Sequence, residues 1–174
     1  LGWLKPESLQ TGSGGNRIVF CLNHDADGID LVCHADGRLR LSVNQWPDSV
    51  RNDSAPGRLV VGKWTFFAVS YNATRLEENV NWFFSPPLDA PGPAELKLDR
   101  ISTCNHGPAG TDLRGLAIGN FNETMHGYGL DRQFRGEIRR LEIFGSRTGT
   151  GGSLDQAAIE QRLKARTPAE ETPP

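Results

Sequence analysis

The sequence predicts an all-β domain of two packed antiparallel sheets, followed by one short helix. Apolar and polar residues alternate along most of the 174-residue chain, with the period of two that is typical of half-buried strands. The 20 glycines and 11 prolines divide the chain into short segments joined by turns rather than into long helices. Consecutive strands joined by short turns pair antiparallel, and a sheet with one apolar face buries that face against another layer.

Composition limits the classes of function. The length suits one domain. A net charge of −2 and a pI of about 6.1 provide no basic surface for a phosphate backbone, so we expect no nucleic-acid partner. No apolar run approaches the roughly 20 residues that span a bilayer, so we expect no membrane insertion.

Three strands are predicted in the first quarter of the chain, at residues 17–22, 29–33 and 38–43. The turns between them lie at residues 25–28 and at Asp36-Gly37, a dipeptide that supplies the positive φ of a tight hairpin. In the third strand the apolar side chains share one face and the arginines point to water; the apolar residues are Leu39, Leu41 and Val43. The three strands form an antiparallel meander.

Residues 65–71 form the strongest predicted strand, because they are aromatic, β-branched and apolar on both faces. This strand should be central in its sheet. Residues 79–85 form the next strand, in which Trp82 and Phe84 share one face and Phe83 takes the other.

Further strands are expected near residues 95–98, 116–118 and 134–144, and the last two should close the sheets. A short helix is expected from about residue 154 to 164. Ser153 and Gln156 form a capping-box signature at its start. One face of the helix is apolar; its residues are Ile159 and Leu163.

Three segments follow one another in the order of a known sequence pattern. They are residues 62–72 (GKWTFFAVSYN), 116–120 (LAIGN) and 134–144 (FRGEIRRLEIF). They resemble the pattern of the laminin G-like, concanavalin A-like family, which reads G-x-W-x-x-hydrophobic-A-V-x-Y, then L-x-I-G-N, then F-x-G-x-I-D-x-hydrophobic-x-I-Y. The resemblance runs from Trp3 to about Leu163 and implies a two-sheet antiparallel jelly-roll sandwich. The fold does not name a ligand, because it carries sugar binders, adhesion modules and some glycosidases.

The predicted domain spans residues 1–166. Residues 167–174 are rich in proline and glutamate and have no large apolar anchor, and we expect a disordered tail or linker there. The segment from Trp3 to Pro6 resembles the W-x-K-P that follows an early strand in the family. The resemblance therefore implies that the chain begins inside a strand, lacks the family's first strand and is part of a larger protein.

The chain has three cysteines, Cys21, Cys33 and Cys104. Cys21 and Cys33 flank the turn at residues 25–28, so a disulfide across two strands is one interpretation, and an extracellular setting would permit it. Two small buried thiols are the other interpretation.

Glu137 and Glu142 are the carboxylates that a glycosidase would need. Laminarinase-type enzymes of this fold carry E-x-D-x-x-E, and here Arg139 replaces the central acid. The two glutamates are five positions apart, so a regular strand points them to opposite faces, whereas a retaining pair lies about 5–5.5 Å apart. We therefore expect no enzyme, and keep a divergent glycosidase as a third hypothesis.

Calcium is left open as a cofactor. The resemblance implies a calcium site near the I-D-D part of the last-strand pattern, but Arg139 and Arg140 replace those acids, and a guanidinium supplies no ligand oxygen. The acidic turns at residues 25–27 and 48–53 remain as alternative calcium loops, although acidic turns are usually just solvated.

Two loops combine an aromatic ring with planar polar groups, the mixture that sugar sites use. Residues 44–48 form the first loop and residues 120–128 the second. The candidate ligand-binding residues are Asn44, Trp46 and Asp48 in the first loop, and Asn120, Asn122, His126 and Tyr128 in the second.

Each ring in these loops also fits a structural role: Trp46 as a lid on the core, His126 as a surface histidine, and Tyr128 as a side chain packed under its own loop. On balance the sequence predicts a non-catalytic, extracytoplasmic module that binds a polysaccharide or glycan. A protein-adhesion or scaffolding module is the alternative, and it predicts an exposed apolar patch or a pairing sheet edge.

Overall fold

The computed structural model describes residues 1–12, 14–22, 27–44, 52–110, 115–121, 130–146 and 152–165. Ten strands and one helix occur in this part of the chain. In chain order they are β1 (Gly2–Pro6), β2 (Asn16–Leu22), β3 (Gly28–Cys33), β4 (Leu39–Val43), β5 (Asn52–Asp53), β6 (Thr65–Tyr71), β7 (Val80–Phe84), β8 (Lys97–Ser102), β9 (Ala117–Ile118), β10 (Gly136–Arg139) and α1 (Gln156–Ala165).

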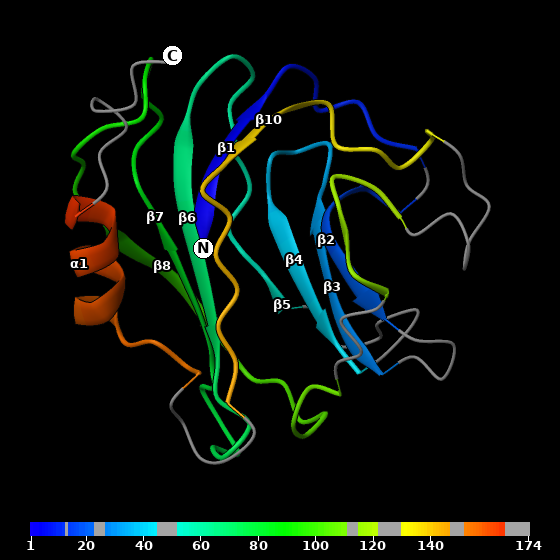
Figure 1. Cartoon of the computed structure of the whole chain (residues 1–174), viewed down its shortest axis with the longest axis vertical. Helices are drawn as coiled ribbons and strands as arrows, with labels where there is room; N and C mark the ends of the chain where they lie inside the picture. The colour runs from blue at the N-terminus through cyan, green and yellow to red at the C-terminus, as the bar shows by residue number, and fades with distance from the viewer. Residues whose placement is uncertain are drawn as a thin grey trace.

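The strands form two antiparallel sheets of five strands each, packed face to face as a β-sandwich (Figure 1). The first sheet has the order β10-β1-β6-β7-β8, and the second has the order β5-β4-β3-β2-β9. The predicted meander is confirmed, since β2, β3 and β4 are neighbours in the second sheet. The prediction that residues 65–71 form a central strand is also confirmed, because β6 is the middle strand of the first sheet.

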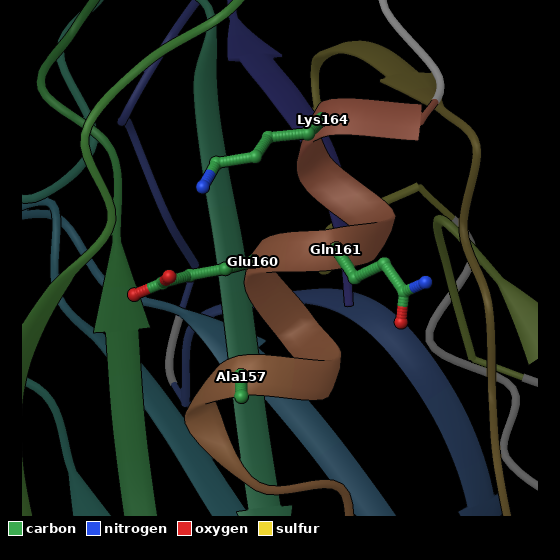
Figure 2. A pocket seen from close by; sticks show the side chains of 4 residues that line it. All are labelled: Ala157, Glu160, Gln161 and Lys164. Carbon is green, nitrogen blue, oxygen red and sulfur yellow. The ribbon is translucent and has the colours of Figure 1, made fainter.

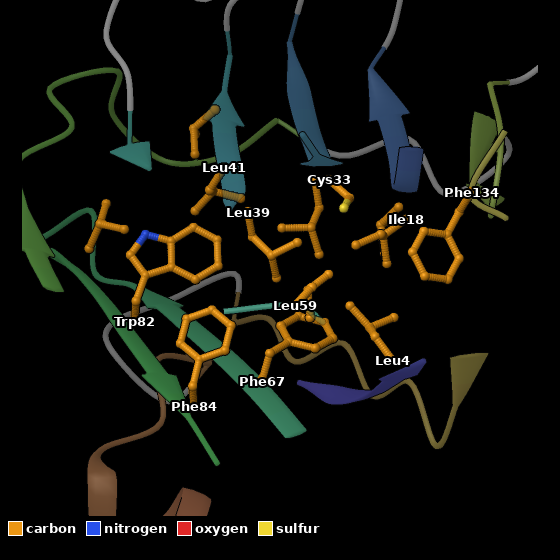
Figure 3. Packing of buried hydrophobic residues seen from close by; sticks show 14 of the residues in the cluster. Leu4, Ile18, Cys33, Leu39, Leu41, Leu59, Phe67, Trp82, Phe84 and Phe134 are labelled. Carbon is orange, nitrogen blue, oxygen red and sulfur yellow. The ribbon is translucent and has the colours of Figure 1, made fainter. Parts of the chain in front are cut away.

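The main core lies between the sheets (Figure 3). Trp82 and Phe84 from β7 and Phe67 from β6 point toward the second sheet, where Leu39 and Leu41 of β4 meet them. Trp82 and Phe67 are fully buried. The alternation along β7 is the predicted one, because Phe83 points to the other face of the first sheet and packs with a separate apolar cluster.

Hydrogen bonds close the sandwich on its two long sides. On one side the hydroxyl of Ser102 in β8 donates to the amide oxygen of Asn52 in β5 at 3.1 Å, and the Asp99 carboxylate accepts from the backbone of Ala55 at 2.8 Å. A bulge in β8 lets the Asp99 side chain turn inward there. On the other side the Phe134 amide donates to the Gly119 carbonyl at 2.8 Å.

The C-terminal helix covers the outer face of the first sheet (Figure 1). Ile159 and Leu163 are buried against the sheet, as the sequence predicts. The predicted cap is wrong: the Asp155 carboxylate accepts from the Ala158 amide at 2.8 Å, so Asp155 and not Ser153 begins the helix. The Gln156 side chain instead donates to Glu160 within the helix, at 2.8 Å.

The N-terminal strand lies between β10 and β6, so it is an inner strand of its sheet. The last strand is shorter than the expected 134–144, since it ends at Arg139, and Arg140 takes a positive φ of 50° that breaks the extended chain. One hydrogen-bonded pair continues beyond this bend, where Leu1 and Glu142 exchange backbone bonds.

The cysteines do not form the disulfide considered above. None of the three is in a disulfide, and all three are buried. Cys21 lies opposite Ile29, while Cys33 lies opposite Asn16 at the far end of the same pair of strands. The interpretation as small buried thiols is therefore the one that the structure supports, and burial raises the pKa of the Cys33 thiol to about 12.

Candidate functional site

The outer face of the first sheet is aromatic and occupied. Trp3, Trp64, Phe66 and Phe83 gather there, each at most 5% exposed, under the apolar side of α1. A shallow hollow runs along the helix, and Figure 2 shows Glu160 and Lys164 extending to one side of it and Gln161 to the other. Because these four rings are already covered, they do not form an open aromatic platform.

The outer face of the second sheet carries a buried ion pair. The Arg17 guanidinium of β2 donates to the Asp30 carboxylate of β3 at 2.9 Å, and the two side chains are 3% and 2% exposed. The carbonyls of Gly14 and Gly15 accept from the same guanidinium at 2.8 and 3.0 Å. The positive φ of Gly14 and Gly15 lets their carbonyls reach Arg17.

Two segments that are distant in sequence meet at Arg17. The guanidinium lies over the Phe121 ring at 4.0 Å from its centre, and the Phe20 ring packs edge-on against Phe121 at 4.7 Å. The backbone N–H of Arg17 donates to the Arg132 carbonyl at 2.8 Å. The Arg132 guanidinium lies 5.4 Å from the centre of the same Phe121 ring.

A second charged group lies toward the β5 edge of this face. Arg40 donates to both oxygens of Asp53, at 2.6 and 3.0 Å, and Arg38 pairs with Asp53 at 3.2 Å. The sequence placed both arginines in water, but they are only 17% and 30% exposed because they hold this carboxylate. Partial burial by itself raises the pKa of Asp53, but the hydrogen bond and charge of Arg40, with the charge of Arg38, outweigh it and lower that pKa.

His34 lies beside these charges. Burial, together with the positive charges of Arg40 and Arg38, lowers the pKa of His34 to about 4. The imidazole is therefore neutral at physiological pH.

Asn44, the first residue of the predicted sugar loop 44–48, connects the end of β4 to Gly28 and to residues 106–110 by hydrogen bonds. Its amide nitrogen donates to the carbonyls of His106 and Pro108, at 2.9 and 2.6 Å. Its amide oxygen accepts from the backbone of Gly28 and Gly110, at 3.0 and 2.9 Å. These four bonds use the full capacity of an amide group, and they hold Asn44 at a φ of 51°. A ligand that bonded to this side chain would have to replace one of them.

Asn120 begins the second predicted loop, and its side-chain oxygen accepts from the Phe121 backbone at 2.8 Å. The remaining candidate residues, Trp46, Asp48, Asn122, His126 and Tyr128, lie outside the described residues.

Both predicted loops leave from the second sheet. Asn44 follows β4 and Asn120 follows shortly after β9, with β3 and β2 between those strands. Three interstrand spacings put the two strands about 14 Å apart. β4 and β9 run in opposite directions, so Asn44 lies beside Gly28 at one end of the sheet, whereas the chain after β9 runs toward Arg17 at the other end. Both loops therefore leave from the second sheet, but from its opposite ends.

The two glutamates considered for catalysis have separate cationic partners. Lys5 donates to Glu137 at 2.9 Å, and Arg162 pairs with Glu142 at 3.1 Å. The hydrogen bond from Lys5 is the largest influence on Glu137 and lowers its pKa, with the charges of Lys5 and Arg139 adding to the effect. A carboxyl group with a lowered pKa is a poor proton donor. Arg139 also stacks on Trp64, at 4.7 Å from the ring centre.

The described residues hold no group of three or more metal-ligating side chains. Of the acids in the proposed calcium loops, Asp53 is bound to two arginines and Asp27 is exposed, while Asp25 and Asp48 lie outside the described part of the chain.

Sequence reasoning missed the group formed by Arg17, Asp30 and Phe121. A signal was present, since a charged residue stands inside each of two consecutive apolar strands, and the charges are opposite. Such pairs are strong candidates for contact across a hairpin. Phe121 gave no such signal, because its partners depend on how the chain returns to the sheet.

Compared with protein-family models, curated proteins and solved structures, the chain gives no match. Among the described residues, no helix is long and apolar enough to cross a membrane. The structure thus defines a β-sandwich with one helix-covered outer face and one polar outer face.

Proposed function

We propose that this chain is a non-catalytic, extracytoplasmic binding module of the laminin G-like jelly-roll kind that recognises a polysaccharide or glycan as part of a larger protein. One observation carries the proposal: both loops with the aromatic and amide residues leave from the second sheet, one from each end, while α1 covers the first sheet. Because α1 covers the aromatic rings that gather on the first sheet, the loops are the better source of an exposed platform.

The separate pairing of Glu137 and Glu142 supports a binding role over a glycosidase. A retaining or inverting enzyme needs two carboxyls that act on one bond. The third hypothesis is tested by hydrolysis of laminarin, agar or alginate, since a divergent glycosidase would act on one of them and lose that activity in Glu137→Gln.

The proposal is tested by binding to a panel of soluble polysaccharides, with and without a calcium chelator. Trp46→Ala and Tyr128→Ala should abolish binding and leave the unfolding temperature nearly unchanged. Leu76→Ala is the matched control, because Leu76 is an 83% exposed side chain in the turn between β6 and β7. If both aromatic variants bind as strongly as the control, the proposed site is wrong. Binding that the chelator abolishes would add a calcium ion to the site.

An exposed apolar strip favours the second candidate, a protein-adhesion module. Leu98 and Ile101 of the edge strand β8 are 48% and 43% exposed, and edge strands with apolar side chains are sites of chain association. An absence of binding across the polysaccharide panel, with self-association or capture of a partner that Leu98→Glu removes, would favour this candidate.

A further inference from the structure

Three Asn-x-Ser/Thr triplets, the acceptor sequence for N-linked oligosaccharides, begin at Asn52, Asn72 and Asn122. Polar loops contain such triplets by chance, so the surroundings of each asparagine have to select among them. Asn122 lies outside the described residues. The comparison is therefore between Asn52 in β5 and Asn72 in the turn between β6 and β7.

Asn52 is enclosed in the fold. Its side chain is 0% exposed, and its amide oxygen accepts from the Ser102 hydroxyl of β8 at 3.1 Å. The Nδ2 nitrogen of Asn52, which is the atom that carries the sugar in an N-linked glycan, is buried as well. An N-linked glycan is a bulky surface group. A sugar at this position would therefore have to displace β5 from the sandwich.

Asn72 has the opposite surroundings. It is partly exposed and begins a hairpin turn in which residues 74–78 are all exposed. Its side-chain oxygen Oδ1 accepts from the Thr74 backbone N–H at 3.0 Å and from the Thr74 hydroxyl at 2.7 Å. Its Nδ2 nitrogen donates to no group in the part of the chain that the structure describes. The turn thus uses one atom of the amide and leaves the other for a substituent.

A sugar on Nδ2 is compatible with this turn, because a glycosylated amide keeps its oxygen and can still accept both bonds from Thr74. The base of the turn is held by other groups. The Asn79 side chain, which is 2% exposed, donates to the carbonyls of Arg75 and Cys104 at 3.0 and 2.8 Å. The substituent would extend from a hairpin whose base does not depend on the Nδ2 atom of Asn72.

We propose that Asn72 is an acceptor site for an N-linked oligosaccharide. The donor class is an oligosaccharide joined through pyrophosphate to a polyprenyl lipid. In the transfer, Nδ2 of Asn72 attacks C1 of the first sugar and an N–C1 bond forms. The C1–O bond to the pyrophosphate breaks, the polyprenyl pyrophosphate leaves, and the amide gives up one proton to a base of the transferase. This inference rests on the extracytoplasmic location in the proposed function, but not on recognition of a glycan ligand.

The test secretes the full 174-residue chain from a eukaryotic host and measures the occupancy of Asn72 and Asn52 by mass spectrometry of their peptides. We expect an oligosaccharide on Asn72 in most of the folded, secreted protein and none on Asn52. Thr74→Ser keeps the acceptor triplet and should keep the sugar, whereas Thr74→Ala should lose it completely although Asn72 is unchanged. An unmodified Asn72 would overturn the proposal, and a sugar on Asn52 in the folded protein would overturn the selection by burial.

An amidase that hydrolyses the bond between the sugar and Asn72 provides the second readout. Because residues 74–78 are exposed, we expect the enzyme to release the oligosaccharide from the native protein without urea. Release only after unfolding would overturn the placement of the sugar at an open turn. The host delivers the chain to the transferase whatever its natural location, so an unmodified Asn72 counts against the site alone. The polysaccharide panel tests the proposed function separately.

Discussion

Replacing Leu163 by alanine should release α1 from the first sheet without unfolding the sandwich. The helix is held mainly by Ile159 and Leu163, which are 1% and 3% exposed. Full burial of one such side chain contributes about 1.5–3 kcal/mol, so the two together supply about 3–6 kcal/mol. The pairing of Arg162 with Glu142 at 3.1 Å is partly exposed and adds about 0–1 kcal/mol.

The change in Leu163→Ala can be worked from these values. Losing one of the two contacts removes about 2–3 kcal/mol, which lowers the ratio of docked to undocked helix at least 30-fold. A helix of 10 residues is below the roughly 12–15 residues at which isolated helices become stable in water, so the undocked helix should also unwind. Its departure would expose Trp3 and Trp64, whereas Trp82 would stay in the core between the sheets.

Hydrogen exchange and tryptophan fluorescence measure this directly. In Leu163→Ala the amides of α1 should lose protection and the emission should shift to longer wavelength, while the amides of β6 stay protected. Gln161→Ala is the control, because Gln161 is exposed on the same helix and alanine favours helix. If the α1 amides of Leu163→Ala remain as protected as those of β6, the helix is not held by these two side chains and the reasoning fails.

Three further outcomes are expected. Asn44→Ala should lower the free energy of unfolding by about 2–4 kcal/mol in urea titration, because four hydrogen bonds are lost, two of them partly buried and two exposed, and a typical bond contributes about 0.5–1.5 kcal/mol; wild-type stability would show that water replaces the amide. His34 has a pKa lowered from 6.5 to about 4 by burial and by Arg40 and Arg38, so the unfolded chain takes up the proton first. The stabilisation from the neutral, buried His34 is present above about pH 6.5 and is lost as the pH falls toward 4. The free energy of unfolding should therefore change less between pH 7 and 4 in His34→Gln, and an identical slope would contradict this. Cys33, buried and with a pKa raised to about 12, should resist iodoacetamide at pH 8 in the native protein and react in urea, whereas rapid native labelling would mean that the strand opens.

The period of the apolar residues was enough to predict the sandwich and its layers. In β7, Trp82 and Phe84 face one way and Phe83 the other because alternate side chains of a strand point to opposite faces. The same pattern located β6 at the centre of its sheet. These features depend on the alternation of side chains within a single strand, so the sequence of each strand alone is enough to predict them.

Register could not be predicted in this way. The hairpin closes with Leu22 opposite Gly28, so Cys21 lies opposite Ile29 and far from Cys33, and a bulge between Arg17 and Val19 shifts the pairing by one more residue, which puts Cys33 opposite Asn16. A bulge adds one residue to one strand only and leaves little trace in the apolar pattern. The helix start was missed for a related reason, since Asp155 and Ser153 are both good N-cap residues and only the path of the preceding chain selects between them.

For the candidate site, the sequence identified two loops with suitable side chains but did not predict the contacts that their described residues make. Asn44 was chosen for its ability to bond sugar hydroxyls, but the structure engages its amide in four bonds between distant backbone segments. The jelly-roll resemblance and the glycan partner stay predictions. The buried pair of Arg17 and Asp30 shows why site residues are hard to separate from structural ones: both kinds are polar residues at positions where the apolar pattern is interrupted.

The two outer faces of the sandwich limit where a ligand could be recognised. A ligand that used the rings of the first sheet would have to displace α1 and pay for the contacts of Ile159 and Leu163. On the second sheet, a ligand that reached the strands would have to break the pair of Arg17 and Asp30, and separating a buried pair costs about 3–5 kcal/mol. Neither cost applies to the loops that leave the second sheet after β4 and β9. The energetics of the scaffold therefore favour recognition by loops at the rim of the second sheet over recognition by either sheet face.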